Sequence, residues 1–237
     1  MTLSMVVPYG DWFGAIERQA SRICRRAVLA VALGLAMAGP SLAQTAAERP
    51  LKLVALGDSL TAGYGLPASA AFPAKLQKAL RDKGITVEIS NAGVSGDTTS
   101  GGLARLDWSL PKDVDGVILE LGANDALRGI DPQVARQSLE EILKRLKARN
   151  IPVLLCGMYA PPNYGEQYAA KFNAIYPELA KQYEVPLYPF FLEGVATVER
   201  LNQPDGLHPT EAGVEAIVAN ILPTVEAFIG AIRRQRG

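Results

Sequence analysis

The chain's only histidine, His208, lies near the C-terminus in the stretch QPDGLHPTEAG. Asp205 precedes it by three positions, and Gly206 lets the chain bend between them, so the carboxylate can reach one nitrogen of the imidazole ring. The other ring nitrogen then faces outward, where it can take a proton from a nucleophile. The spacing predicts a pair of carboxylate and imidazole built on a single turn.

Ser59 is the best-placed nucleophile for that pair. It follows the apolar run LVALGD, at the end of a predicted strand, where a helix can begin and direct backbone N–H groups at a bound group. A serine hydroxyl is a poor nucleophile until a base takes its proton, and His208 is the only imidazole available. The surrounding residues do not match G-x-S-x-G, so the nucleophile elbow of α/β-hydrolases is not predicted.

Two further residues are candidates to stabilise the oxyanion that develops during acyl transfer. Gly93 can bring a bare backbone N–H close to a substrate, and Asn124 can offer its side-chain amide. Both lie in polar, glycine-rich segments, NAGVSGDTT and GANDALRG, each of which follows a predicted strand. Chemistry at these loops is therefore predicted to be acyl transfer by a serine nucleophile.

Other carboxylates and the cysteine in this chain are interpreted more simply. Asp58, Asp97 and Asp125 are interpreted as acceptors that organise their loops, since short acidic side chains commonly bond nearby backbone N–H groups. Cys156 lies in an apolar run and is expected to be a buried hydrophobic residue. With one histidine and one such cysteine, no metal and no cofactor are predicted, although a carboxylate site for a hard cation stays open.

The elements that must position these residues alternate along the chain. Apolar segments of strand length are Leu51–Gly57, Ile85–Gly93, Asp115–Gly122, Ile151–Met158 and Val185–Phe190. Segments of helical spacing lie near Phe72–Lys83, Ser100–Leu110, Pro132–Arg149, Glu166–Tyr183 and Thr210–Ile232. Strands that are apolar on both faces and separated by helices predict a three-layer α/β domain with a parallel sheet. Ligands of such sheets bind beyond the carboxyl ends of the strands.

The four segments GDSLTAGYGL, NAGVSGDTT, GANDALRG and DGLHPTEAG resemble the four sequence blocks of the SGNH (GDSL) hydrolase family. The likeness extends over nearly all of residues 51–228, and it is strongest to the exported bacterial branch of thioesterases, lysophospholipases and arylesterases. It implies a flavodoxin-like sandwich with strand order 2-1-3-4-5. It also implies that Ser59 is the nucleophile, His208 the base and Asp205 its partner. The N–H groups of Ser59 and Gly93, with the Asn124 amide, would form the oxyanion hole.

The same resemblance implies that the segment Asp125–Ile130 borders the acyl pocket. Asp125, Ala126 and Leu127 are accordingly expected to contact the substrate, a small acyl ester, thioester or lysophospholipid. Two alternatives stay open. One is a carbohydrate O-acetyl esterase of the same fold, and the other is a non-catalytic flavodoxin-like domain that holds a small anionic ligand over its Gly/Ser loops.

Residues 1–43 are predicted to be a signal peptide, followed by one hydrolase domain over residues 44–237. Four arginines precede the apolar run AVLAVALGLAMA, which at 12 residues is shorter than the roughly 20 needed to span a membrane. Ser41–Ala43 supplies small residues for cleavage near Ala43. We therefore expect a periplasmic or secreted protein without a stable membrane span, an uncleaved N-terminal anchor being the alternative.

Charge and cysteine content limit the expected partners. Lys+Arg and Asp+Glu both number 24, so the chain lacks the basic excess typical of nucleic-acid binding. Cys24 would leave with the signal peptide, and Cys156 alone cannot form an internal disulfide. We expect a monomer whose partner is its small-molecule substrate.

Overall fold

A five-stranded parallel sheet forms the centre of the computed structural model, which describes residues 49–236; the predicted signal peptide lies outside these residues. The strands are β1 (Leu51–Gly57), β2 (Val87–Gly93), β3 (Gly116–Glu120), β4 (Val153–Cys156) and β5 (Leu187–Tyr188). Their order is β2-β1-β3-β4-β5, and every neighbouring pair is parallel. Both the fold class and the strand order predicted above are confirmed.

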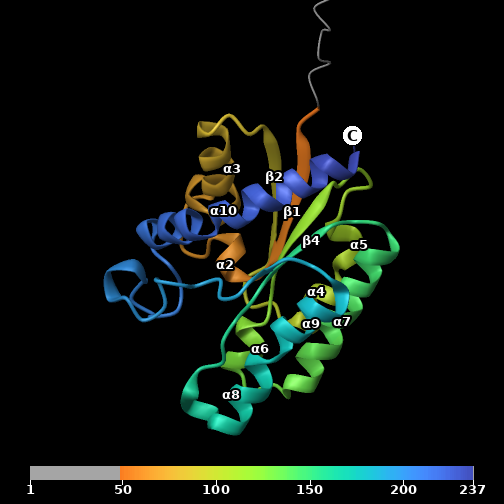
Figure 1. Cartoon of the computed structure of the whole chain (residues 1–237). Coiled ribbons are helices and arrows are strands. Elements are labelled where there is room, and N and C mark those ends of the chain that lie inside the picture. The colour runs from red at the N-terminus through yellow and green to blue at the C-terminus, as the bar shows by residue number, and fades with distance from the viewer. Residues whose placement is uncertain (1–48, 237) are drawn as a thin grey trace, which may run out of the picture. The chain divides into compact units, whose positions relative to one another are not determined.

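Helices cover both faces of this sheet (Figure 1). They are α2 (Ser59–Ala62), α3 (Phe72–Asp82), α4 (Thr99–Ala104), α5 (Leu106–Ser109), α6 (Ala123–Leu127), α7 (Pro132–Ala148), α8 (Glu166–Asn173), α9 (Ile175–Tyr183) and α10 (Glu211–Arg236). Short 3-10 turns lie at Ala68–Ala70, Pro162–Tyr164 and Glu199–Leu201. The helices α3 and α10 pack on one face, and α4, α5, α7 and α9 lie on the other. The result is the predicted three-layer sandwich.

Apolar side chains on both faces of β1 and β3 form the centre of the core. Every residue of β3 is buried, and on β1 only Lys52 is more than slightly exposed. The long helix α7 buries Leu139, Ile142 and Leu146 against this sheet, at the spacing that puts residues on one side of a helix. Burial of this kind fixes the strands whose carboxyl ends carry the candidate site.

Two helices that the sequence predicts as continuous are each divided in two. The predicted helix Ser100–Leu110 breaks at Arg105, whose guanidinium turns inward to donate to the carbonyl of Gly57 at 2.7 Å. The predicted helix Glu166–Tyr183 breaks at Ala174. Pro177 is the reason, because it lacks the N–H that would bond the carbonyl of Asn173.

Among residues 49–236, only α10 is long and apolar enough to cross a membrane by length and composition. It nevertheless packs as a core helix, with Ile217, Ile221, Phe228 and Ile232 buried. Ion pairs also tie it to α3, since Lys75 lies 2.6 Å from Glu211 and 2.8 Å from Glu215. The helix is therefore part of the domain's sandwich.

Candidate active site

Ser59 lies at the junction of β1 and α2, where the chain turns sharply. The Asp58 carboxylate accepts the Leu60 N–H at 3.0 Å and thereby caps the helix, which ends four residues later at Gly63 in the left-handed conformation. Ser59 is the first residue of α2, so its own N–H has no partner within the helix. The hydroxyl thus emerges beside a helix N-terminus at the carboxyl end of β1.

The structure brings Ser59, His208 and Asp205 together. The Nε2 atom of His208 lies 2.9 Å from Ser59 Oγ, and its Nδ1 atom lies 2.6 Å from Asp205 Oδ2. The second oxygen of Asp205 accepts the backbone N–H groups of Leu207 and His208 at 2.9 and 3.0 Å. The hydrogen bonds from His208 and Leu207 lower the pKa of Asp205 to about 2, so this carboxylate stays ionised at neutral pH.

Gln203 joins the loop that carries His208 to the loop that carries Ser59. Its backbone N–H donates to the His208 carbonyl at 2.7 Å, and its side-chain amide donates to the carbonyls of Tyr64 and Pro209 at 2.7 and 3.0 Å. The Tyr64 ring also packs against the imidazole, with 4.4 Å between centroids. The sequence analysis missed Gln203; the one signal for it was its place in the His208 segment.

Gly93 and Asn124, the predicted oxyanion donors, both lie beside the serine turn. A Cβ atom at Gly93 would collide with the backbone of Ala62, so this approach requires glycine. The Gly93 N–H donates to the side-chain oxygen of Asn91 at 2.9 Å. The Asn124 amide nitrogen donates to Asp58 Oδ2 at 3.2 Å and to the Asp97 carbonyl at 2.9 Å. Both donors must therefore exchange a partner before they can bind an oxyanion.

A buried carboxyl group, that of Glu120 at the end of β3, supports the serine turn. Its Oε2 atom accepts the Thr61 hydroxyl at 2.7 Å and the Asp58 N–H at 3.4 Å, while Oε1 has no partner among the described residues. Burial, with a smaller contribution from the Asp58 charge, raises the pKa of Glu120 well above its usual range. Burial also raises the pKa of Asp58, to about 6. Sequence reasoning treated Glu120 only as part of a strand.

Replacing Glu120 by glutamine should change how stability depends on pH. In the unfolded chain the carboxyl ionises near 4.5, whereas burial lets it keep its proton to higher pH in the folded chain, so wild-type stability falls as pH rises above about 4.5. Glutamine does not titrate. Between about pH 4.5 and about pH 7.5, the free energy of unfolding of Glu120→Gln should therefore rise relative to that of wild type. Urea unfolding at both pH values measures this gain, and a pH-independent difference would contradict it.

The serine and histidine open onto a largely apolar cleft of about 370 Å³. Its walls include Leu60, Met158, Phe190 and Leu192, and no Asp, Glu, Lys or Arg is among the residues that line it. These walls come from segments that follow β1, β3, β4 and β5. An uncharged cleft of this kind suits a hydrocarbon chain rather than a charged group.

The three predicted substrate contacts have different positions. Ala126 and Leu127 line the cleft, but Asp125 does not reach it. The Asp125 carboxylate is buried and accepts the N–H and the hydroxyl of Thr99 at 2.9 and 2.7 Å. Asp125 is therefore a structural acceptor, which is also how the sequence analysis interpreted it together with Asp58 and Asp97.

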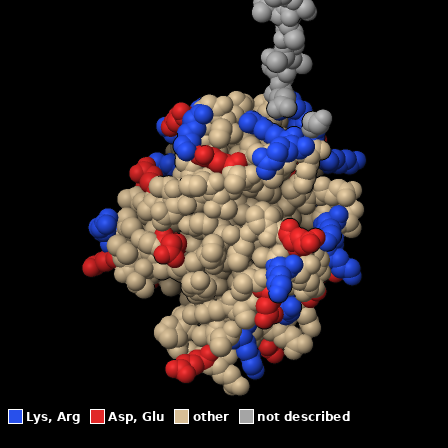
Figure 2. Space-filling model, in the orientation of Figure 1, with Lys and Arg blue, Asp and Glu red and all other residues tan. Residues whose placement is uncertain are grey.

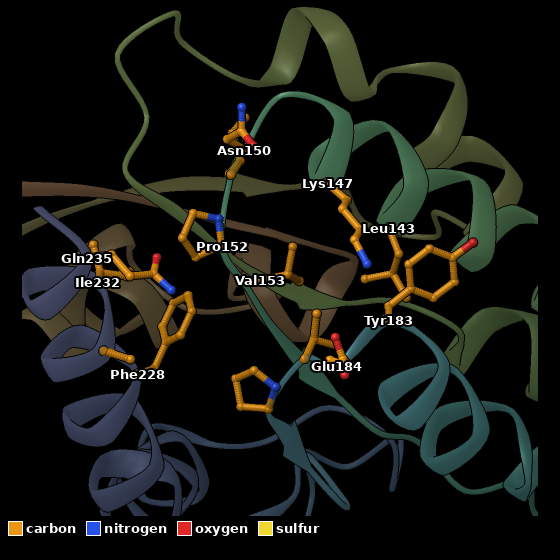
Figure 3. Close-up of a pocket in the computed structure, with 14 residues that line it drawn as sticks. Leu143, Lys147, Asn150, Pro152, Val153, Tyr183, Glu184, Phe228, Ile232 and Gln235 are labelled. Carbon is orange, nitrogen blue, oxygen red and sulfur yellow. The ribbon is translucent and has the colours of Figure 1, made fainter.

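A second depression, of about 330 Å³, lies away from these residues (Figure 3). Residues that precede β4 and β5 line it together with the end of α10, so it belongs to the opposite edge of the sheet. Its walls carry no serine, histidine or cysteine. Within residues 49–236, no group of three or more His, Cys, Asp or Glu side chains could hold a metal ion.

Comparison with known proteins shows the family to which the chain belongs. Residues 55–216 match the model of the GDSL-like lipase/acylhydrolase family. The chain belongs to this GDSL (SGNH) hydrolase family. This GDSL hydrolase is 41% identical over 189 residues to Esterase TesA of Pseudomonas aeruginosa, covering 79% of the chain and 93% of TesA. It is 48% identical over 158 residues to Thioesterase 1/protease 1/lysophospholipase L1 of Escherichia coli K12, covering 66% of the chain and 74% of that relative.

A solved structure gives the same result. The crystal structure of AlinE4, an SGNH-hydrolase family esterase, superposes on this GDSL hydrolase with a TM-score of 0.64 at 50% identity. The match covers 75% of the chain and 96% of AlinE4. The predicted family, fold and enzyme class are thus confirmed: the protein is an ester hydrolase, and the non-catalytic binding domain considered above is ruled out.

Proposed function

We propose that this hydrolase cleaves acyl esters and thioesters, including lysophospholipids, through Ser59, His208 and Asp205. The contact of 2.9 Å between Ser59 Oγ and His208 Nε2, at the edge of the uncharged cleft, carries this proposal. This contact places a base, the imidazole of His208, beside the hydroxyl of Ser59, which is a poor nucleophile without one. The printed names of the relatives, an esterase and a thioesterase/lysophospholipase, support the same substrate classes.

The reaction begins when Ser59 Oγ attacks the acyl carbonyl while His208 Nε2 takes the hydroxyl proton. Asp205 holds the imidazole and stabilises its charged form. The tetrahedral oxyanion binds the N–H groups of Ser59 and Gly93 and the Asn124 amide, and for this Gly93 and Asn124 leave their present partners. His208 then gives its proton to the departing alcohol or thiol, and an acyl-enzyme remains on Ser59. Water attacks this ester by the reverse sequence, so the acid is released and the enzyme restored.

A substrate panel tests the proposed specificity. Specificity constants are compared for p-nitrophenyl esters of increasing chain length, for acyl-thioesters and for lysophospholipid. We expect kcat/KM to rise with chain length until the acyl group fills the cleft. A preference for acetylated sugars over every longer acyl ester would contradict this substrate assignment and favour the carbohydrate O-acetyl esterase.

Replacing Asn124 by alanine should lower kcat by about 10²–10³-fold, with a smaller effect on KM. The reason is that the amide matters most once negative charge has developed on the substrate oxygen. Steady-state kinetics on one p-nitrophenyl ester measure both constants. A loss confined to KM would assign Asn124 to substrate positioning instead.

We also propose that the protein is exported after cleavage near Ala43. The support is the N-terminal sequence, in which arginines precede a short apolar run and a small-residue cleavage site. N-terminal sequencing of protein from the periplasmic or secreted fraction should begin near Gln44. Recovery of the intact N-terminus in washed membranes would favour the uncleaved anchor.

A further inference from the structure

Exposed hydrophobic side chains gather around the mouth of the cleft. Eight large hydrophobic residues among positions 49–236 are at least 42% exposed, and six of them lie at the cleft or next to the serine turn. We name these six the apolar collar: Tyr64, Val94, Leu127, Tyr159, Tyr164 and Leu207. The other two are Val134 on α7 and Trp108 on α5, the short helix that precedes β3. Single exposed hydrophobic residues are ordinary, but a contiguous group is typical of an interaction site.

The collar is continuous with the cleft and with the serine turn. Leu127, Tyr159 and Leu207 themselves line the cleft. The Tyr164 hydroxyl donates to the Leu127 carbonyl at 3.0 Å, which places that ring beside Leu127. On the other side, the Val94 N–H donates to the Gly57 carbonyl at 3.0 Å, directly before the serine turn. With Tyr64 on the imidazole, apolar groups therefore border the reaction centre on several sides.

Charged groups lie around this region rather than within it. The surface over α2 and toward α6 is tan in Figure 2, and the charged side chains of that face lie around it. Within five residues of a collar residue along the chain, the described part of the protein exposes four acidic residues and one basic residue. These are Asp131, Glu166, Asp205 and Glu211, against Arg128. An anionic surface would be repelled by this excess of acidic groups.

We propose that the apolar collar docks the enzyme onto a zwitterionic phospholipid surface, so that an ester at that surface reaches Ser59 directly. Three of the six collar residues are tyrosines, whose rings are apolar at one end and polar at the other, as a lipid–water boundary favours. The reaction centre is also shallow, since the His208 and Asp205 side chains are 21% and 37% exposed. The identity of the ester rests on the proposed function, whereas the docking itself requires no hydrolysis.

Binding to phosphatidylcholine vesicles tests the proposal. All proteins carry Ser59→Ala so that no lipid is consumed, and cosedimentation gives the partition coefficient. The collar variant is Val94→Ser with Tyr164→Ser, two residues that do not line the cleft. The matched control is Val134→Ser with Trp108→Ser, which removes one valine and one aromatic ring elsewhere. The partition coefficient of the collar variant should be lower than that of the parent by at least about 10-fold, because only collar groups leave water on docking. The partition coefficient of the control should stay within about 2-fold of the parent.

Two further measurements can contradict the proposal. One is the dependence of vesicle binding on lipid composition, and the other is the oligomeric state of the protein. Adding phosphatidylglycerol should weaken binding; a requirement for it would overturn the proposal in favour of attraction by basic groups. Equal binding by the parent and the collar variant, with thermal midpoints unchanged, would also overturn it. So would a lipid-independent dimer that the collar variant abolishes, because the collar would then serve a second copy. If the wild type binds the vesicles but hydrolyses no p-nitrophenyl ester, acyl-thioester or lysophospholipid, the proposed function alone fails. If it hydrolyses these substrates but does not bind the vesicles, the docking proposal alone fails.

Discussion

Replacing Ser59 by alanine is expected to lower kcat for ester hydrolysis by about 10⁴-fold or more. Alanine removes the hydroxyl that attacks the acyl carbonyl, and Ser59 is the hydrogen-bond partner of His208 Nε2 within residues 49–236. Ser59 is 7% exposed and its side chain is small, so the loss of the hydroxyl should leave the thermal midpoint within a few degrees of wild type. Kinetics on a p-nitrophenyl ester and a thermal melt of the same preparation measure the two effects.

Ser95→Ala is the matched control for that variant. Ser95 is an exposed serine of the segment NAGVSGDTT, close in sequence to Gly93, and it lies outside the cleft lining. Its replacement should leave kcat within about 2-fold of wild type, as is usual for an exposed position. Substantial hydrolysis by Ser59→Ala would remove Ser59 from the mechanism.

Replacing His208 by alanine should cause a loss of similar size, about 10⁴-fold in kcat, because the serine hydroxyl then has no base. Since only the proton acceptor is missing, added imidazole should restore part of the activity of His208→Ala. It should restore none in Ser59→Ala. Titrating kcat against imidazole concentration for the two variants makes the comparison.

Chemical modification gives an independent form of the same prediction, because His208 is the chain's only histidine. Diethylpyrocarbonate should inactivate the wild type in proportion to carbethoxylation of one imidazole, and hydroxylamine should reverse the loss. A substrate-like inhibitor that fills the cleft should protect the enzyme. A fully carbethoxylated enzyme that hydrolyses esters at the wild-type rate would exclude His208 as the base.

The features that sequence predicts well depend on local spacing or on motif. Asp205 and His208 are three residues apart on a glycine-containing turn, so their contact could be predicted without knowledge of the fold. Ser59, Gly93 and Asn124 each lie at or just after the end of a predicted strand, and parallel strands bring their carboxyl ends to one edge of the sheet. The order of the sheet came from the resemblance to a family, because strand periodicity alone does not specify it.

The features that sequence does not predict depend on contacts between distant segments. The break at Arg105 arises because its guanidinium reaches β1, whereas helical spacing continues through that position. Gln203 joins two loops that are 139 positions apart in the sequence. The sequence did not predict that Glu120 supports the serine turn, because Glu120 lies in an apolar strand and its partner Thr61 is 59 positions away. Asp125 was expected at the cleft, but a distant hydroxyl on Thr99 holds it away.

The most direct test of the central claim is to identify the residue that becomes covalently modified. Wild-type enzyme is treated with a p-nitrophenyl alkylphosphonate, and the adduct is located by intact mass measurement and peptide mapping. We expect one adduct per molecule, on Ser59, with release of one equivalent of nitrophenol and loss of all ester hydrolysis. Modification should be far slower in His208→Ala. An adduct on any other residue, or a fully inhibited enzyme with Ser59 unmodified, would contradict the account.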